Sequence, residues 1–211
     1  MAEARETKGN KVGLFGGSFD PIHFGHLNLA MELKEKHHLD EVWFCPAHIN
    51  PHKLDANTPA LALHRLKMVE LAVAGIPGFR VIDNEISREG PSYTIDTLHA
   101  LIADEAKTGN GRTFALLLGA DAIPGFFRWH CPLEIVRLVP LFIGSRAGTL
   151  NISQLEGDPE ILAAIQKGMT ETRLFDVSAT AVRYRLSKGL YCGHLVPKEV
   201  LDYIYTNHLY S

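Results

Sequence analysis

The sequence is poor in cysteine, and the three cysteines that it has cannot form a disulfide framework. Cys45, Cys131 and Cys192 lie far apart, their number is odd, and no CxxC pair occurs. Paired cysteines are typical of oxidising compartments, whereas reducing compartments keep thiols free. We therefore expect a cytoplasmic protein.

Long apolar runs and a strong excess of one charge are also missing. No apolar run reaches the roughly 20 residues that cross a bilayer, and residues 1–10 lack the apolar core of a signal peptide. The 21 basic and 24 acidic residues give a net charge of −3. We expect neither a nucleic-acid partner nor a membrane partner, since both favour a basic excess.

The chain of 211 residues is long enough to bury a full core without metal or disulfide staples. We expect residues 1–10 to be a flexible extension and residues 11–211 to form a single domain. The sequence does not set the oligomeric state, and a homo-oligomer is compatible with it.

Strand-like and helix-like segments alternate along the chain. This alternation predicts a Rossmann-like, doubly wound α/β fold, with a mostly parallel sheet and helices on both faces. On the helix-like segment 61–74, Leu63, Leu66, Val69 and Val73 share one side. The strand-like runs are 12–15, 41–45, 79–82, 114–118, 141–143 and 173–175, and the helix-like segments are 27–37, 61–74, 94–106 and 197–209.

Ligands of such sheets bind beyond the carboxyl ends of the strands. Gly16 and Gly17 follow the first strand-like run and permit close approach of a ligand to the backbone. His23 and His26 come at or just before a helix start, where free N–H groups and partial positive charge suit a phosphate. Gly25 between them leaves room for the ligand.

Two other interpretations of this histidine pair stay open. A histidine near a helix start is often a cap or a surface residue. A metal-dependent hydrolase is the second alternative, with His48 or His52 as a third metal ligand. The two glycines favour phosphate over metal.

A second candidate phosphate site lies far along the chain. Ser178 is a good helix N-cap, Thr180 falls in the first turn, and Arg183 follows one turn later. The guanidinium of Arg183 could clamp a phosphate with two hydrogen bonds. The alternative is an ordinary capped helix with a solvated arginine.

Four further segments carry candidate binding residues. Lys53 could meet a phosphate, or belong to a polar loop. Asp121 follows a strand and could accept hydrogen bonds from a ribose, or cap a helix. A tryptophan such as Trp129 is more often a core residue than a ligand platform. The segment Ser92-Tyr93-Thr94 opens a helix with hydroxyl groups.

The first of these segments resembles a family signature over its full length. Gly-Gly-Ser-Phe-Asp-Pro-Ile-His-Phe-Gly-His, residues 16–26, is similar to the signature of the HxGH nucleotidyltransferase superfamily, and residues 177–183 resemble its second signature, ISxTxxR, with Val177 in place of isoleucine. Together with the four further segments, residues 11–209 resemble the bacterial-type nicotinate-nucleotide adenylyltransferases.

The resemblance implies an AMP transfer from ATP to nicotinate mononucleotide, with Mg²⁺ held mainly by the ATP phosphates. It implies that Trp129 stacks on the pyridine ring, and that Thr94 and backbone N–H groups near His130 receive the carboxylate. The other implied mononucleotide-binding residues are His52, Lys53, Ser92 and Tyr93. The implied ATP-binding residues are His23, His26 and Arg183 as catalytic groups, with Gly16, Gly17, Ser18, Phe19, Asp121, Ser178 and Thr180.

Two positions depart from the family pattern. Asn50 replaces the first of two paired prolines in the loop PAHINPHK, and His130 stands where an aromatic residue is common. Within the superfamily, a pantetheine-phosphate adenylyltransferase or a cytidylyltransferase is the nearest alternative, and the segments around Thr94 and Trp129 argue against both. A nucleotide-binding sensor without activity is the non-enzymatic alternative, and the two complete signatures argue against it.

Overall fold

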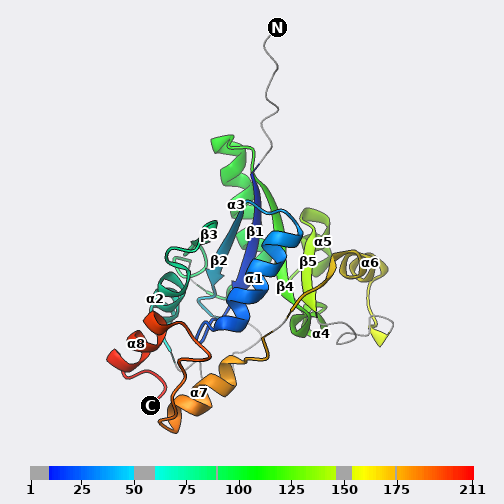
Figure 1. The fold of residues 1–211 in the computed structure, drawn as a ribbon. Helices are drawn as coiled ribbons and strands as arrows, with labels where there is room; N and C mark the ends of the chain where they lie inside the picture. The colour runs from blue at the N-terminus through cyan, green and yellow to red at the C-terminus, as the bar shows by residue number, and fades with distance from the viewer. Residues whose placement is uncertain (1–9, 50–59, 89, 146–153, 174) are drawn as a thin grey trace.

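A computed structural model describes residues 10–49, 60–88, 90–145, 154–173 and 175–211. The described strands form one six-stranded sheet in the order β3-β2-β1-β4-β5-β6, and every neighbouring pair is parallel. The strands are β1 (Lys11–Gly17), β2 (Glu41–Pro46), β3 (Phe79–Val81), β4 (Thr113–Gly119), β5 (Leu141–Ser145) and β6 (Met169–Glu171). The predicted Rossmann-like, doubly wound sheet is confirmed (Figure 1).

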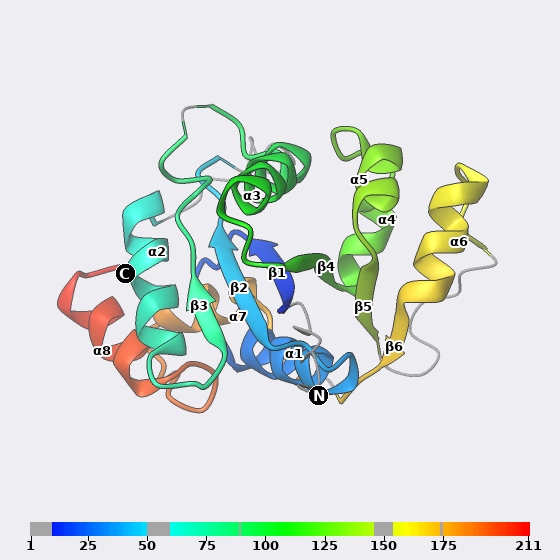
Figure 2. The same cartoon turned by 90° about the horizontal axis from the view of Figure 1, so that it is seen from above.

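Helices cover both faces of this sheet. One hydrophobic core joins α1, α2, α7 and α8 to the sheet, and a second joins α3, α4, α5 and α6 to the opposite face. Figure 2 shows α1 and α3 on opposite sides of β1 and β2. The helices are α1 (Phe24–Lys36), α2 (Ala62–Val73), α3 (Thr94–Thr108), α4 (Ile123–Phe126), α5 (Pro132–Leu138), α6 (Pro159–Gly168), α7 (Ala179–Ser187) and α8 (Lys198–Thr206), with a short 3₁₀ turn η2 (Ala120–Ala122).

The strand order reverses at β1. The chain leaves β1 through α1 toward β2, whereas β4 lies on the other side of β1 and follows α3. The crevice between the carboxyl ends of β1 and β4 is therefore the switch point where doubly wound sheets bind ligands. Gly17 ends β1 and Gly119 ends β4, so two glycines border this crevice.

Three expectations from the sequence are corrected. The last strand is Met169–Glu171 rather than residues 173–175, and this edge strand is short and half exposed, so it lacks an apolar run. The first helix begins at Phe24, three residues before the expected start. On α2 the side chain of Leu63 is 70% exposed, and the buried stripe runs through Arg65, Met68, Val69, Ala72 and Val73.

Three helices between β4 and β6 were not predicted from the sequence. Segments α4, α5 and α6 each begin with or contain a proline in the first turn, which fits a helix start. Over the described ranges, every helix is too short or too polar to span a bilayer.

Candidate active site

The two histidines of the first motif cap the same helix. His23 is the N-cap of α1, and its Nδ1 accepts a hydrogen bond from the backbone N–H of His26 at 3.3 Å. In return, Nδ1 of His26 accepts from the backbone N–H of His23 at 3.3 Å. The rings stack with their centroids 3.6 Å apart. Because each Nδ1 accepts, a neutral ring carries its proton on Nε2.

His23 is almost completely buried, with 5% of its surface exposed. Burial lowers the pKa of His23 to about 4, because a charged imidazolium loses its hydration there. The ring is therefore neutral at pH 7. Gly25 makes room for it: a Cβ at residue 25 would lie 3.0 Å from Nδ1 of His23 and 3.3 Å from the carbonyl oxygen of Phe175.

Buried side chains fix the segment Ser18-Phe19, which precedes the two histidines. Phe19 is 2% exposed and packs in the core, with the edge of its ring against His26 at 5.1 Å between centroids. The buried guanidinium of Arg65 donates to the carbonyl oxygens of Ser18 at 2.8 Å and of His48 at 2.9 Å. Arg65 was missed in the sequence, although an arginine at the buried spacing of Met68 and Val69 is a usable signal.

The second candidate phosphate site, formed by Ser178, Thr180 and Arg183, lies beside the first motif. Ser178 caps α7, as predicted, by accepting from the N–H of Ala181 at 3.2 Å. Arg183 uses Nη1 to donate to the carbonyl oxygen of Asp20 at 2.7 Å and Nη2 to donate to Oγ1 of Thr180 at 3.3 Å. The structure thus brings together two motifs that lie about 160 residues apart in the chain.

A cavity opens beside the carboxyl end of β1. It gathers Gly16 and Gly17 with the predicted mononucleotide-binding residues of two other segments. The rings of Tyr93 and His130 face each other there at 4.5 Å between centroids. The lining residues are Gly16, Gly17, Ala47, Glu85, Ser92, Tyr93, Thr94, Leu116, Leu118, Trp129 and His130.

Helix α3 begins at this cavity. Thr94 is its first residue, and the N-cap Tyr93 makes no side-chain capping hydrogen bond. The positive end of this 15-residue helix therefore faces the cavity without a capping hydrogen bond from the side chain of Tyr93, and Asp96 is the acidic residue of its first turn. Ser92 ties this helix start to the loop after β2, because its Oγ accepts from the N–H of His48 at 2.9 Å.

Glu85 is a buried carboxyl in the cavity wall that sequence reasoning missed. It is 6% exposed, and its Oε1 accepts from Oγ1 of Thr97 at 2.9 Å. Burial raises the pKa of Glu85, while hydrogen bonds from Thr97 and Ser92 oppose the rise. Glu85 thus links the start of α3 to the segment after β3. A lone glutamate in a loop-like stretch gives no sequence signal for this contact.

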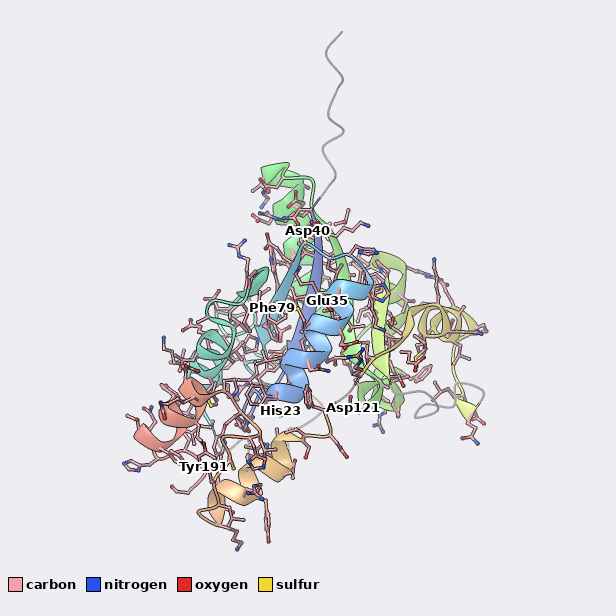
Figure 3. All side chains as sticks on the ribbon, viewed as in Figure 1. His23, Glu35, Asp40, Phe79, Asp121 and Tyr191 are labelled. Carbon is pink, nitrogen blue, oxygen red and sulfur yellow. The ribbon has the colours of Figure 1, made fainter. Side chains whose placement is uncertain are left out.

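Asp121 lies next to the cavity, in η2 directly after β4. It is exposed, and its carboxylate lies against Gly119. Figure 3 shows His23 and Asp121 at the same end of the molecule. The N-cap of η2 is Gly119, so the alternative role of Asp121 as an N-cap is wrong. His52 and Lys53 lie outside the described residues.

The metal-site alternative gains no support from His48. Its Nδ1 lies 3.2 Å from the carbonyl oxygen of Arg88, and its backbone N–H is bonded to Ser92. Within the described ranges, no three His, Cys, Asp or Glu side chains are grouped so that they could hold a metal ion.

Comparison with known proteins decides the family. Residues 14–185 match the family model described as Cytidylyltransferase-like. The chain is 43% identical to a "Probable nicotinate-nucleotide adenylyltransferase" of Dehalococcoides mccartyi, over 95% of this chain and 97% of that protein. It is 39% identical to the protein of the same name from Salinibacter ruber, over 94% and 97% of the two chains. The chain belongs to the nicotinate-nucleotide adenylyltransferase family.

A solved adenylyltransferase shares the fold of this chain. It is the Plasmodium falciparum nicotinic acid mononucleotide adenylyltransferase complexed with APC, with a TM-score of 0.71, 20% identity, and 95% and 97% of the two chains covered. The same Plasmodium protein complexed with NaAD gives a TM-score of 0.70. The resemblance seen in the two sequence signatures is thus confirmed for the family and for the fold.

Proposed function

We propose that this chain transfers AMP from ATP to nicotinate mononucleotide and releases deamido-NAD and pyrophosphate, a step of NAD biosynthesis. The observation that carries the proposal is the meeting of two differently built sites at the end of β1. The capped His23–His26 pair and Arg183 lie on one side. The cavity with Trp129 and the start of α3 lies on the other.

The ATP side supplies hydrogen-bond donors. We assign the Nε2–H groups of His23 and His26 to the phosphate oxygens, because Nδ1 of each ring is already engaged within the protein. Arg183 adds a permanent positive charge at the triphosphate. Ser178 and Thr180 border the same phosphates, Asp121 holds a ribose, and Gly16, Gly17, Ser18 and Phe19 contribute through their backbone.

The acceptor side suits a pyridine ring that carries a carboxylate. Trp129 is half-buried in the cavity wall and offers a face for stacking. The carboxylate would lie at Thr94, where a helix dipole favours negative charge. Ser92, Tyr93 and the backbone at His130 surround it, and His52 and Lys53 approach the mononucleotide phosphate.

The proposed chemistry needs no protein nucleophile. The 5′-phosphate oxygen of the mononucleotide attacks the α-phosphorus of ATP in line, the bond to the bridging oxygen breaks, and pyrophosphate leaves with the electron pair. Both reactants are anions, so the protein must position them and stabilise charge that develops in the transition state. His26 and Arg183 are the groups we assign to that charge.

Mg²⁺ would enter with ATP and neutralise charge on the phosphate oxygens. The donor set fits this form of binding. The described residues offer no cage of three carboxylate, histidine or cysteine ligands, and the carboxylate of Asp20 is bonded to Tyr210. The metal would therefore be held mostly by phosphate and water.

We also propose that residues 11–211 act as one catalytic domain in the cytoplasm.

Product analysis tests the proposed function. Purified protein with ATP, Mg²⁺ and nicotinate mononucleotide should form one deamido-NAD for each pyrophosphate, as read by mass spectrometry and a pyrophosphate assay. Hydrolysis of either nucleotide without a joined product, above all hydrolysis that needs added zinc, would support the metal-hydrolase alternative instead.

A further inference from the structure

The end of the chain reaches the ATP side of the site. Tyr210 is the penultimate residue and only 8% exposed. Its hydroxyl donates a hydrogen bond of 2.6 Å to Oδ1 of Asp20, across 190 residues of sequence. In Figure 1 the C-terminus lies beside α8, near α2 and at the same end of the molecule as α7. Tyr210 thus contacts the segment that carries His23 and His26.

Asp20 connects this phenol to Arg183. The carboxyl is 3% exposed, and its Oδ2 lies 3.9 Å from Nη1 of Arg183. The same Nη1 donates to the backbone oxygen of Asp20 at 2.7 Å. One residue of the first motif therefore holds the guanidinium of the second motif by both its backbone and its charge.

The charge of Asp20 depends on its neighbours. Burial raises the pKa of Asp20, while the hydrogen bond from Tyr210 and the positive charges of Arg183 and Arg65 oppose the rise. Burial also raises the pKa of Tyr210, so the phenol stays protonated and keeps donating. Without the phenol, the buried carboxylate would lose the 2.6 Å hydrogen bond from Tyr210 and keep only the backbone hydrogen bond from Ala60, so the carboxyl would turn or take up a proton.

We propose that Tyr210 is a positioning residue for AMP transfer, whose hydroxyl fixes the carboxylate of Asp20 and through it the guanidinium of Arg183 at the triphosphate. This inference rests on the proposed function, because it needs Arg183 to act on ATP. Tyr210 itself does not touch the reacting atoms.

A second tyrosine, Tyr203, provides a control that distinguishes positioning of Arg183 from general anchoring of the C-terminal helix α8. The hydroxyl of Tyr203, on α8, is hydrogen-bonded to Nδ1 of His64 on α2 at 2.9 Å. The change Tyr203→Phe therefore removes a joint between the C-terminal helix and the body of the protein without touching Asp20. It is the matched control for Tyr210→Phe.

The first test compares these two variants by steady-state kinetics and thermal unfolding. Tyr210→Phe should lower kcat about tenfold, as expected for loss of a buried hydrogen bond to a charged group, and leave the KM for nicotinate mononucleotide unchanged. Tyr203→Phe should keep the wild-type kcat. An equal loss of kcat in both variants, or none in a folded Tyr210→Phe protein, overturns the inference.

The second test asks whether Tyr210 acts through Arg183. In an Arg183→Ala background, Tyr210→Phe should lower kcat less than about twofold, since residues that act as one unit are not additive. A full tenfold loss there shows a route that bypasses Arg183 and contradicts the proposal. Wild-type protein in the same assay separates the two failures: absent wild-type turnover refutes the proposed function, whereas normal wild-type turnover with additive losses refutes only the role of Tyr210.

Discussion

Each imidazole of the capping pair presents a different atom to the protein and to the ligand. Nδ1 of His23 and Nδ1 of His26 accept from backbone N–H groups, and the Nε2–H groups are the donors that we assign to phosphate oxygens. Two N–H groups at the start of α1 are thus used within the protein, because that of His26 donates to His23 and that of Phe24 donates to the carbonyl oxygen of Leu195 at 2.9 Å. Phosphate binding thus depends on the side chains more than on the bare helix start.

Removal of one imidazole tests its share of charge stabilisation. We expect His26→Ala to fold and to lose about 10²- to 10³-fold in kcat, or roughly 3–4 kcal/mol, as for other groups that stabilise transition-state charge. Steady-state kinetics with circular dichroism as the folding control measures this. A well-folded variant with near-normal turnover would remove His26 from the mechanism.

The buried His23 predicts a dependence of stability on pH. Its pKa falls from 6.5 in the unfolded chain to about 4 in the folded protein, so between these values the unfolded state binds more protons. His23 should therefore contribute a decrease of about 3 kcal/mol to the free energy of unfolding as the pH falls from above 6.5 to 4. Urea unfolding across this range measures the decrease.

His23→Asn supplies the control, because asparagine caps helices and does not titrate. The variant should lose less stability than the wild type over the same pH range. The raised pKa values of Asp20 and Glu85 act in both proteins and cancel in the comparison. Equal pH dependence in the two proteins would mean that His23 is not the group responsible.

At the scale of elements, the start of α1 depends on a glycine. Gly25→Ala would place a Cβ 3.0 Å from the ring of His23 and 3.3 Å from a backbone oxygen. We expect kcat to fall about tenfold through displacement of the ring, while stability changes by less than about 1 kcal/mol because alanine favours helix. Gly125→Ala, in α4, has open space around it and should leave kcat unchanged.

The segment after β4 predicts a different kinetic signature. Trp129 would bind the pyridine ring equally in the ground state and the transition state, so Trp129→Ala should raise the KM for nicotinate mononucleotide about tenfold with kcat nearly unchanged. The KM for ATP, measured in the same assay, is the internal control. An unchanged KM for the mononucleotide would rule out stacking.

Some elements were predictable because their signals are local. The start of α7 at Ser178 and the position of Arg183 one turn later follow from capping preferences. The strand β6 was misplaced because its three residues, Met-Thr-Glu, carry no apolar pattern. Helices α4 and α5 were missed because they have only four and seven residues, and such short helices depend on packing more than on propensity.

At the scale of the whole molecule, the sequence could predict the parallel doubly wound sheet from its alternating segments. It could not predict which distant residues support the site. Arg65, Glu85 and Tyr210 act through contacts with segments far away in the chain, and such contacts depend on the folded backbone. These contacts support a site between the starts of two helices, α1 and α3, which pack on opposite faces of the sheet.

The central claim is that one helix start receives ATP and the other receives the carboxylate of the second nucleotide. Pyrophosphate release, measured with ATP and Mg²⁺ and with each mononucleotide in turn, tests it most directly. We predict a higher kcat/KM with nicotinate mononucleotide than with nicotinamide mononucleotide, by about tenfold or more, because only the former brings a negative charge to the start of α3. Equal rates would contradict the assignment of Thr94, and no release with either mononucleotide would contradict the account as a whole.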